Sequence, residues 1–116
     1  MTLGEKQRLF SRLLPQLLDY IHGQGYDVAM GEGYVGLSGR EAPVHRHDGG
    51  HYKKIAQDLD LFKLGVYLRT TEAHAPFGAY WETLHPLCRW GGRWGDGNHY
   101  SLSDAGVSLR AEREED

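Results

Sequence analysis

The sequence contains one cysteine, Cys88, among its 116 residues. A single thiol cannot close an intramolecular disulfide, so a reducing compartment is expected. No apolar run approaches the roughly 18 residues that a membrane-spanning helix needs, which predicts a chain that does not insert into a membrane. The N-terminal sequence MTLGEKQRLF lacks the apolar segment of an export signal. We therefore expect synthesis and residence in a cytoplasm, with any external substrate reached through a separate release mechanism.

An excess of positive charge is also missing, because 13 lysines and arginines face 16 aspartates and glutamates. The net charge is -3, and residues 112–116 alone carry four acids and one base, which leaves the rest of the chain near neutral. Without a basic stripe, nucleic acid is not an expected partner. A chain of this length fits one domain, which we place at residues 1–103, followed by a polar tail at residues 104–116.

A capping box formed by Thr2 and Glu5 predicts the start of a first helix. Pro15 lies inside the helix and removes one backbone donor, so a kink or a restart is expected there. Gly23 and Gly25 are expected to end it. Apolar residues recur behind the cap at helical spacing: Leu9, Phe10, Leu13, Leu14, Leu17, Leu18 and Ile21.

The rest of the chain predicts short strands, long loops and one further helix. Strands are expected at residues 26–30, 55–62, 66–68 and 98–101, with a loop at residues 31–50 and a turn at Lys63-Leu64-Gly65. The second helix is expected to begin at Pro76 and to end before Pro86. Because helices and strands do not alternate regularly, we predict an α+β fold with a small, mainly antiparallel sheet and flanking helices.

Two aspartates interrupt the apolar segment that begins at Ile55. Side chains alternate along a strand, so Asp58 and Asp60 share one face with Ala56. Core positions are expected at Leu59, Leu61 and Phe62. A solvated strand face explains the two carboxylates equally well. His51 precedes Asp58 by seven residues, and both can reach one ion only if residues 52–54 contain a bulge or turn.

Asp96-Gly-Asn-His99 offers a second pair of polar groups, although a simple turn also explains it. Amide hydrolysis needs a strong nucleophile at neutral pH, a positive centre for the oxyanion and a base. Zinc with three protein ligands and an open position lowers the pKa of a bound water to about 7, and a nearby carboxylate can move the proton. We therefore predict His51, Asp58 and His99 as ligands and Asp96 as the base. Imidazole and carboxylate donors favour Zn²⁺ without excluding other divalent ions.

Other polar and aromatic residues are assigned less specific roles. His45 and His47 lie on the long loop and are expected at the surface, although they are alternative ligands. Asp60 is expected to lie next to the ligands rather than to bind the ion. Structural or packing roles are expected for His74, His85, Trp81, Trp90, Trp94 and Cys88, with the tryptophans in the core or in the wall of a cleft.

His51-x-x-x-x-Ala56-x-Asp58-Leu59, followed by Asp96-x-x-His99-Tyr100, resembles the zinc peptidases that cut peptidoglycan stem peptides. This superfamily joins D-alanyl-D-alanine carboxypeptidases, phage L-alanyl-D-glutamate endolysins and Hedgehog-like domains. The likeness extends to about residue 101 and is strongest to phage and prophage endolysins. Further similar stretches are Gly31-Glu-Gly-Tyr34, Asp58-Leu-Asp-Leu-Phe62, Thr71-Glu-x-His74-x-Pro76 and Trp81-Glu-x-Leu84-His-Pro-Leu-Cys-Arg-Trp-Gly-Gly92.

The resemblance implies a Hedgehog/D,D-peptidase-like fold, the same zinc ligands, and Asp96 as the catalytic carboxylate. It also implies substrate contact near Tyr34, where the family often has a following arginine. That position is Val35 here, and Arg40 or Arg46 are the replacements we consider. Two further departures are Gly49 in place of a usual serine and Lys54 in place of a usual glycine.

The expected function is zinc-dependent hydrolysis of peptidoglycan stem peptides by a monomeric endolysin. The enzyme would be made in the host cytoplasm and reach the cell wall through a holin. Two alternatives remain open, a D,D- or L,D-carboxypeptidase of the cell wall and an inactive, metal-stabilised binding module.

Overall fold

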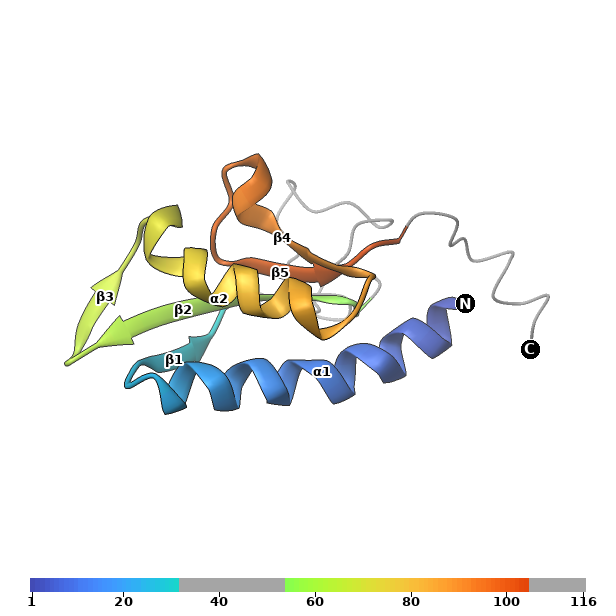
Figure 1. The fold of residues 1–116 in the computed structure, drawn as a ribbon, viewed down its shortest axis with the longest axis horizontal. Coiled ribbons are helices and arrows are strands. Elements are labelled where there is room, and N and C mark those ends of the chain that lie inside the picture. Colours follow the sequence, from blue (N-terminus) through green and yellow to red (C-terminus); the bar gives the residue numbers. More distant parts are fainter. Residues whose placement is uncertain (32–53, 105–116) are drawn as a thin grey trace, which may run out of the picture.

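Two helices cover a mainly antiparallel sheet in the computed structural model, which describes residues 1–31 and 54–104 (Figure 1). This arrangement confirms the predicted α+β class. Residues 105–116 of the predicted tail lie outside the described part, as does the loop from residue 32 to residue 53.

Helix α1 spans Leu3–Gly23 and begins at the predicted capping box. The Thr2 hydroxyl accepts the Glu5 N–H at 3.0 Å, and the Glu5 carboxylate accepts the Thr2 N–H at 2.7 Å. The helix is continuous through Pro15, so the predicted restart does not occur. A proline removes one hydrogen bond, whereas the buried stripe continues on both sides of it with Leu13 and Leu17.

Among the described residues the sheet contains five strands in the order β1-β2-β5-β4, and β3 pairs with β2 outside this path. The strands are β1 Asp27–Met30, β2 Ala56–Lys63, β3 Val66–Leu68, β4 Cys88–Trp90 and β5 His99–Leu102. All four pairings are antiparallel. The sequence did not predict β4, whose three residues are too few to show an alternating pattern.

Strand β2 is the longest of the described strands and pairs with β1, β3 and β5. Strand β1 runs along one of its edges, while β5 and then β3 follow each other along the opposite edge. Leu64 and Gly65 connect β2 to β3 with φ angles of 51° and 78°. A two-residue hairpin with positive φ at both positions matches the right-handed twist of the strands, so the predicted turn is confirmed.

Helix α2 spans Thr71–Leu84 and begins five residues before the predicted start at Pro76. The Thr70 hydroxyl accepts the Ala73 N–H at 3.1 Å and caps the helix. Pro76 was therefore wrong as a start signal, since this helix accommodates a proline in its second turn. The predicted end is confirmed, because Pro86 follows the C-cap residue His85.

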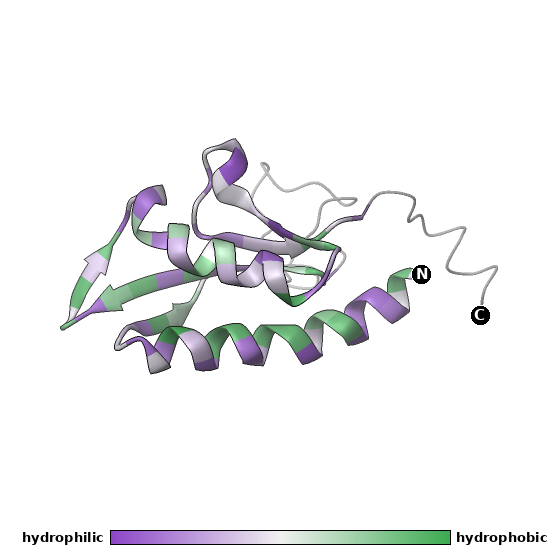
Figure 2. Cartoon of the chain, in the orientation of Figure 1, coloured by the Kyte–Doolittle hydropathy of each residue, from purple (hydrophilic) through white to green (hydrophobic). Residues whose placement is uncertain are grey.

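The core lies between the two helices and the sheet, where the apolar side of α1 and the centre of α2 meet it (Figure 2). Trp81 and Tyr100 are fully buried there with perpendicular rings, as predicted for Trp81. Burial also raises the pKa of the Cys88 thiol to about 12, which fits the predicted packing role. Phe62 is not part of this core, because alternation places it opposite Leu61, where it stacks on Tyr67.

Within the described ranges, neither α1 nor α2 combines the length and the apolar character needed to cross a bilayer.

Candidate metal centre

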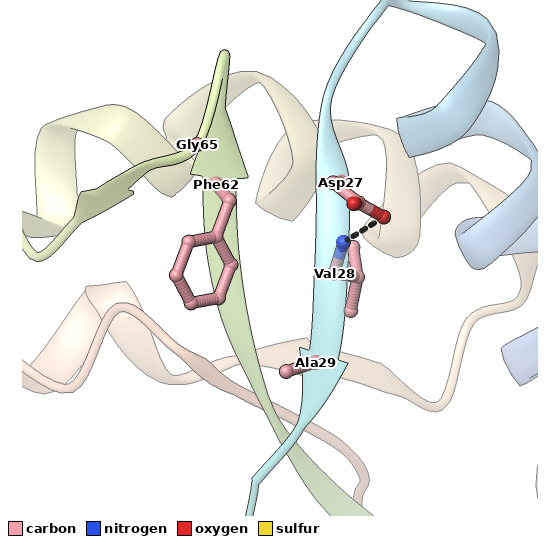
Figure 3. A pocket seen from close by; sticks show the side chains of 5 residues that line it. All are labelled: Asp27, Val28, Ala29, Phe62 and Gly65. Atoms are coloured by element: carbon pink, nitrogen blue, oxygen red, sulfur yellow. Dashed lines mark hydrogen bonds between the residues drawn. The ribbon is translucent and has the colours of Figure 1, made fainter.

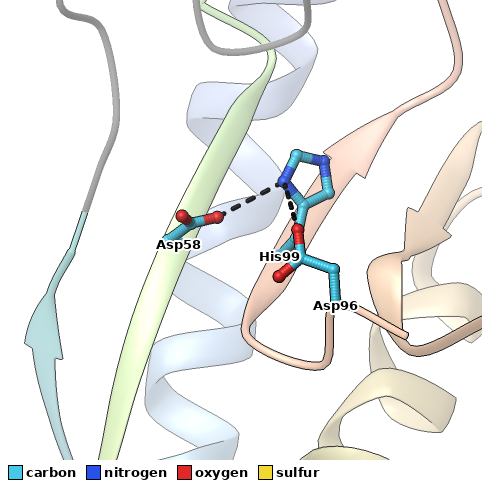
Figure 4. Close-up of side chains that lie close together, drawn as sticks. All are labelled: Asp58, Asp96 and His99. Atoms are coloured by element: carbon cyan, nitrogen blue, oxygen red, sulfur yellow. Dashed lines mark ion pairs between the residues drawn. The ribbon is translucent and has the colours of Figure 1, made fainter. Parts of the chain in front are cut away.

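Asp58 on β2 and His99 on β5 are directly opposite each other in the antiparallel pairing (Figure 4). Asp58 Oδ1 lies 3.3 Å from His99 Nδ1. The two side chains are 20% and 14% exposed, and Asp58 Oδ1 itself is shielded from solvent. The neighbouring Tyr100 points into the core against Trp81, so strand alternation turns His99 and Asp58 to the face opposite the helices.

Asp96 joins this pair from the turn that precedes β5. Its Oδ2 atom lies 4.0 Å from His99 Nδ1, and its side chain is half exposed. The turn is fixed at both ends, because Asp96 N donates to Gly91 O at 2.9 Å and His99 N donates to Asp96 O at 3.2 Å. One ligand atom from each of Asp58, Asp96 and His99 lies within 4.8 Å of the others.

This donor set fits a divalent ion. Zinc binds nitrogen and oxygen at roughly 2.0–2.2 Å, and neighbouring donors of a tetrahedral site are then about 3.4 Å apart. The Asp58–His99 separation of 3.3 Å matches this edge. The 4.0 Å separation of Asp96 from His99 is longer and suits a carboxylate next to the ion. Imidazole and carboxylate donors suit zinc and also other divalent ions.

Three of the predicted site residues, Asp58, Asp96 and His99, therefore come together. The others lie outside the described residues: His51, Tyr34, Arg40 and Arg46, together with His45 and His47. One residue of the predicted turn is described. Lys54 has φ 62°, a left-handed conformation that glycine adopts most readily. This conformation fits the bulge or turn that is expected at residues 52–54.

Asp60 lies further along β2 and does not belong to the metal-ligating group. Its Oδ1 accepts from the Tyr67 hydroxyl on β3 at 3.5 Å. This contact ties Asp60 to the neighbouring strand, and no described contact supports the predicted position beside the ligands.

Trp90 supports the Asp96 turn in a way that the sequence did not reveal. Its ring fills the space above Gly78 and Gly92, where an added Cβ would lie 2.1 Å from ring atoms in each case. Its indole N–H donates to Gly97 O at 2.7 Å, inside the turn. In the sequence, the two glycines are the feature that could indicate this packing, because a residue without a side chain lets a large ring approach the backbone.

Trp94 is 57% exposed, so the prediction of a core position was wrong for this residue. Its ring lies beside His99, with centroids 5.8 Å apart and planes at 61°. Trp94 therefore contributes to the wall of the site, which is the other position that the sequence suggested for the tryptophans.

Glu82 on α2 holds the same segment through charge. Its carboxylate accepts the Arg93 Nε at 2.8 and 2.9 Å and the Trp90 N–H at 3.0 Å, and Arg93 Nη2 also contacts it. The hydrogen bonds from Arg93 lower the pKa of Glu82 below its ordinary value of 4.5. This attachment joins helix α2 to the residues that position Asp96.

The stabilisation by Glu82 should depend on pH. Because the folded-state pKa is lowered, the contribution is complete above pH 4.5 and disappears as the pH falls through the lowered value. We expect Glu82→Gln to reduce the free energy of unfolding in urea at pH 7, and to differ less from wild type below pH 4.5. All measurements are made with a chelator present, so that loss of a bound metal at low pH does not contribute to the difference. Glu72→Gln on α2 is the control. A pH-independent difference would contradict this role.

Gly91 packs directly against the backbone of Asp96 and against His99. A Cβ at this position would lie 2.3 Å from Asp96 O and 2.7 Å from His99 Cβ. We expect Gly91→Ala to displace the turn and to weaken zinc binding by about 10–100-fold, the range found when groups that orient ligands are altered. Titration against a chromophoric chelator measures this. Gly23→Ala, where a Cβ meets nothing within 4 Å, should bind zinc like wild type. Equal affinities of all three proteins would contradict the prediction.

Behind the site, His74 on α2 is buried and its Nδ1 lies 2.8 Å from the Tyr100 hydroxyl. Burial lowers the pKa of His74 and raises that of Tyr100, so both groups remain neutral near pH 7. The contact joins α2 to β5 beside His99 and confirms the predicted structural role of His74.

The pockets on the described surface include two of similar volume. One of about 290 Å³ is bounded by β3, the start of α2 and the turn from Gly95 to Asn98, and it includes Asp96. The other, of about 260 Å³, lies between β1 and the end of β2 (Figure 3). Its carboxylate, Asp27, accepts the Val28 N–H at 3.0 Å. The first pocket adjoins the candidate metal centre, whereas the residues around the second are otherwise apolar or glycine.

Comparison with models of known protein families and with curated protein sequences gives no match.

Proposed function

We propose that this protein is a zinc peptidase that hydrolyses peptidoglycan stem peptides, with the L-alanyl-D-glutamate endopeptidase type as the best-supported activity. The observation that carries the proposal is the placement of Asp58 and His99 at 3.3 Å, with the Asp96 carboxylate 4.0 Å from the same histidine nitrogen. The sequence pattern predicts the same three residues as two ligands and a base. They come from segments about forty residues apart and meet on one face of the sheet.

Each side chain has a defined task in this proposal. A bound zinc ion would activate water near neutral pH and polarise the scissile carbonyl. Asp58 and His99 hold that ion from two paired strands, which fixes their separation. Asp96, half exposed at the edge of the pair, takes a proton from the attacking water and passes it to the leaving amine. A carboxylate on a half-exposed turn can reach both the attacking water and the leaving amine. The Asp58 Oδ1 atom is shielded from solvent and cannot.

The third ligand in the proposal is His51. It lies outside the described residues, three positions before Lys54 and five positions before Ala56, where β2 begins. The positive φ of Lys54 turns the chain at this point, which supports a change of direction between His51 and Asp58. Together with the order of motifs, this backbone conformation supports a Hedgehog/D,D-peptidase-like fold. In this proposal the enzyme is a phage or prophage endolysin that leaves the host cytoplasm through a holin and acts as a monomer.

Digestion of purified sacculi with the zinc-loaded protein tests the activity. Mass spectrometry of the products distinguishes the two peptidase types, because an L-alanyl-D-glutamate endopeptidase creates new N-terminal D-glutamate. A D,D- or L,D-carboxypeptidase releases free D-alanine instead. Intact sacculi after incubation with zinc, cobalt or manganese would overturn the enzymatic proposal.

A non-catalytic, metal-stabilised module is the second candidate, and the proximity of Asp96 to the other two donors favours it. If Asp96 moved to bind the ion, the site would approach the closed coordination of a structural zinc centre. Such a protein would bind zinc, leave sacculi intact and lose zinc affinity when Asp96 is replaced.

A further inference from the structure

The first turn of α2 contacts the chain on both sides of His99. Thr71 and His74 are three residues apart on this helix, so their side chains lie on one side of it. Thr71 packs against the turn before β5, where a Cβ on Gly97 would lie 2.5 Å from Thr71 Cα and 2.8 Å from its hydroxyl oxygen. His74 Nδ1 lies 2.8 Å from the hydroxyl of Tyr100, the residue after His99. One helical turn therefore holds the chain two residues before His99 and one residue after it.

His99 meets Asp58 only in the observed register of β5 on β2. The Leu59 N–H donates to Asn98 O at 2.8 Å, so Asp58 and His99 form a non-hydrogen-bonded pair, in which opposite side chains approach most closely. A shift of one residue would turn His99 to the face that the helices cover. Strand β5 has four residues, so its register depends on side-chain contacts as well as on its backbone pairing.

Tyr100 supplies such a contact, because its side chain is anchored twice. Its ring is fully buried and perpendicular to the Trp81 ring, with centroids 6.3 Å apart. Apolar packing of this kind is non-directional and tolerates a small displacement of the strand. The hydrogen bond is directional, and in the described part of the chain His74 is the only group that makes one with this hydroxyl. Because a buried hydroxyl without a partner is costly, displacement of β5 is opposed by the loss of this bond.

We propose that His74 is a positioning residue of the candidate metal centre, which holds His99 opposite Asp58 through its hydrogen bond to Tyr100. The inference rests on the part of the proposed function that assigns His99 and Asp58 to one ion, and it does not depend on the substrate. His74 does not belong to the metal-ligating group itself. It acts through the residue that follows one of the ligands in β5.

Zinc affinity measures this role, by competition with a chromophoric chelator well below the unfolding temperature. We expect His74→Leu and Tyr100→Phe each to weaken zinc binding by about 10–100-fold, the range found when groups that orient ligands are altered. The double variant should bind no more weakly than the weaker single variant, because both substitutions remove the same hydrogen bond. His74→Asn places an amide near the position of Nδ1 and should recover most of the lost affinity.

A matched core variant separates positioning from a loss of stability alone. Ile21→Val removes one buried methyl group near the end of α1, so it should lower the Tm and leave zinc affinity unchanged. The visible absorption of the Co²⁺-loaded protein is a second readout, because its bands depend on ligand geometry. His74→Leu should alter these bands and Ile21→Val should not. Equal effects of these two variants on zinc affinity and on the Co²⁺ bands would overturn the inference.

NMR of the metal-free protein tests the inference independently of the proposed activity. The Hα atoms of a non-hydrogen-bonded pair lie close together, so an Hα–Hα NOE between Asp58 and His99 reports their register. We expect this NOE in wild type and in Ile21→Val, and a weaker one in His74→Leu. That result supports the inference even if the zinc-loaded protein leaves sacculi intact. An unchanged NOE in His74→Leu would overturn it and leave the peptidase proposal to the sacculus assay.

Discussion

Asp96→Asn is expected to retain bound zinc and to lose hydrolysis of stem peptides by about 10²–10⁴-fold, the usual contribution of a positioned acid–base group. The amide has nearly the same shape as the carboxylate but cannot accept a proton at neutral pH. The backbone contacts of Asp96 with Gly91 and His99 do not involve the side chain, so the turn should persist. The 4.0 Å separation from His99 Nδ1 is longer than a ligand–ligand edge, which is why zinc should remain bound.

Elemental analysis and a coupled assay on a defined stem peptide measure the two properties in the same preparation. Asp19→Asn, an exposed carboxylate on α1, should change neither of them. Loss of zinc together with activity would identify Asp96 as a ligand and favour the metal-stabilised module. Unchanged hydrolysis would remove Asp96 from the mechanism.

The elements that the sequence predicted well are those with strong local signals. Thr2 and Glu5 form a capping box at the predicted place, and Leu64-Gly65 forms the predicted turn. Such features depend on a few adjacent residues and on backbone conformations that few residues favour. They survive into the folded structure because tertiary packing agrees with them.

The incorrect predictions are those in which a local sequence rule was overridden by tertiary structure. Pro76 suggested a helix start, yet Thr70 caps the helix earlier and packing of Phe77 and Trp81 stabilises it. Phe62 was assigned to the core together with Leu59 and Leu61, although strand alternation places it on the other face, against Tyr67. Hydrophobicity alone does not identify a face of the sheet when two adjacent positions are both apolar.

The ligand atoms of the candidate site could be predicted from the sequence, whereas the contacts that hold them in place could not. Asp58, Asp96 and His99 were selected because their chemistry suits one ion, and the pairing of β2 with β5 brings two of them together. The packing of Trp90 against two glycines and the ion pair between Glu82 and Arg93 both depend on tertiary contacts between α2 and the segment that follows it. The two glycines are a sequence signal for the first contact, whereas no local pattern indicates the second.

If zinc stabilises the wild-type protein as proposed, Asp58→Asn and His99→Ala are expected to abolish that stabilisation. A ligand at one hundred times its dissociation constant stabilises the folded state by about 2.7 kcal/mol, which raises the Tm of a domain of this size by roughly 10 °C. Both residues lie on paired strands, with Asp58 Oδ1 3.3 Å from His99 Nδ1. Replacing either residue removes one of these two ligand atoms, and the fixed backbone offers no substitute for it. Thermal unfolding with and without zinc measures the effect.

A histidine far from the site provides the matched control for this measurement. His22 lies on the exposed end of α1, 3.8 Å from Asp27, and His22→Ala should respond to zinc like wild type. If zinc raises the Tm of wild type, His22→Ala and His99→Ala equally, the ion binds elsewhere. If zinc raises none of them, Asp58 and His99 form an ordinary ion pair that stabilises two strands. The zinc response of these variants therefore tests the physical basis of the peptidase proposal before any substrate is added.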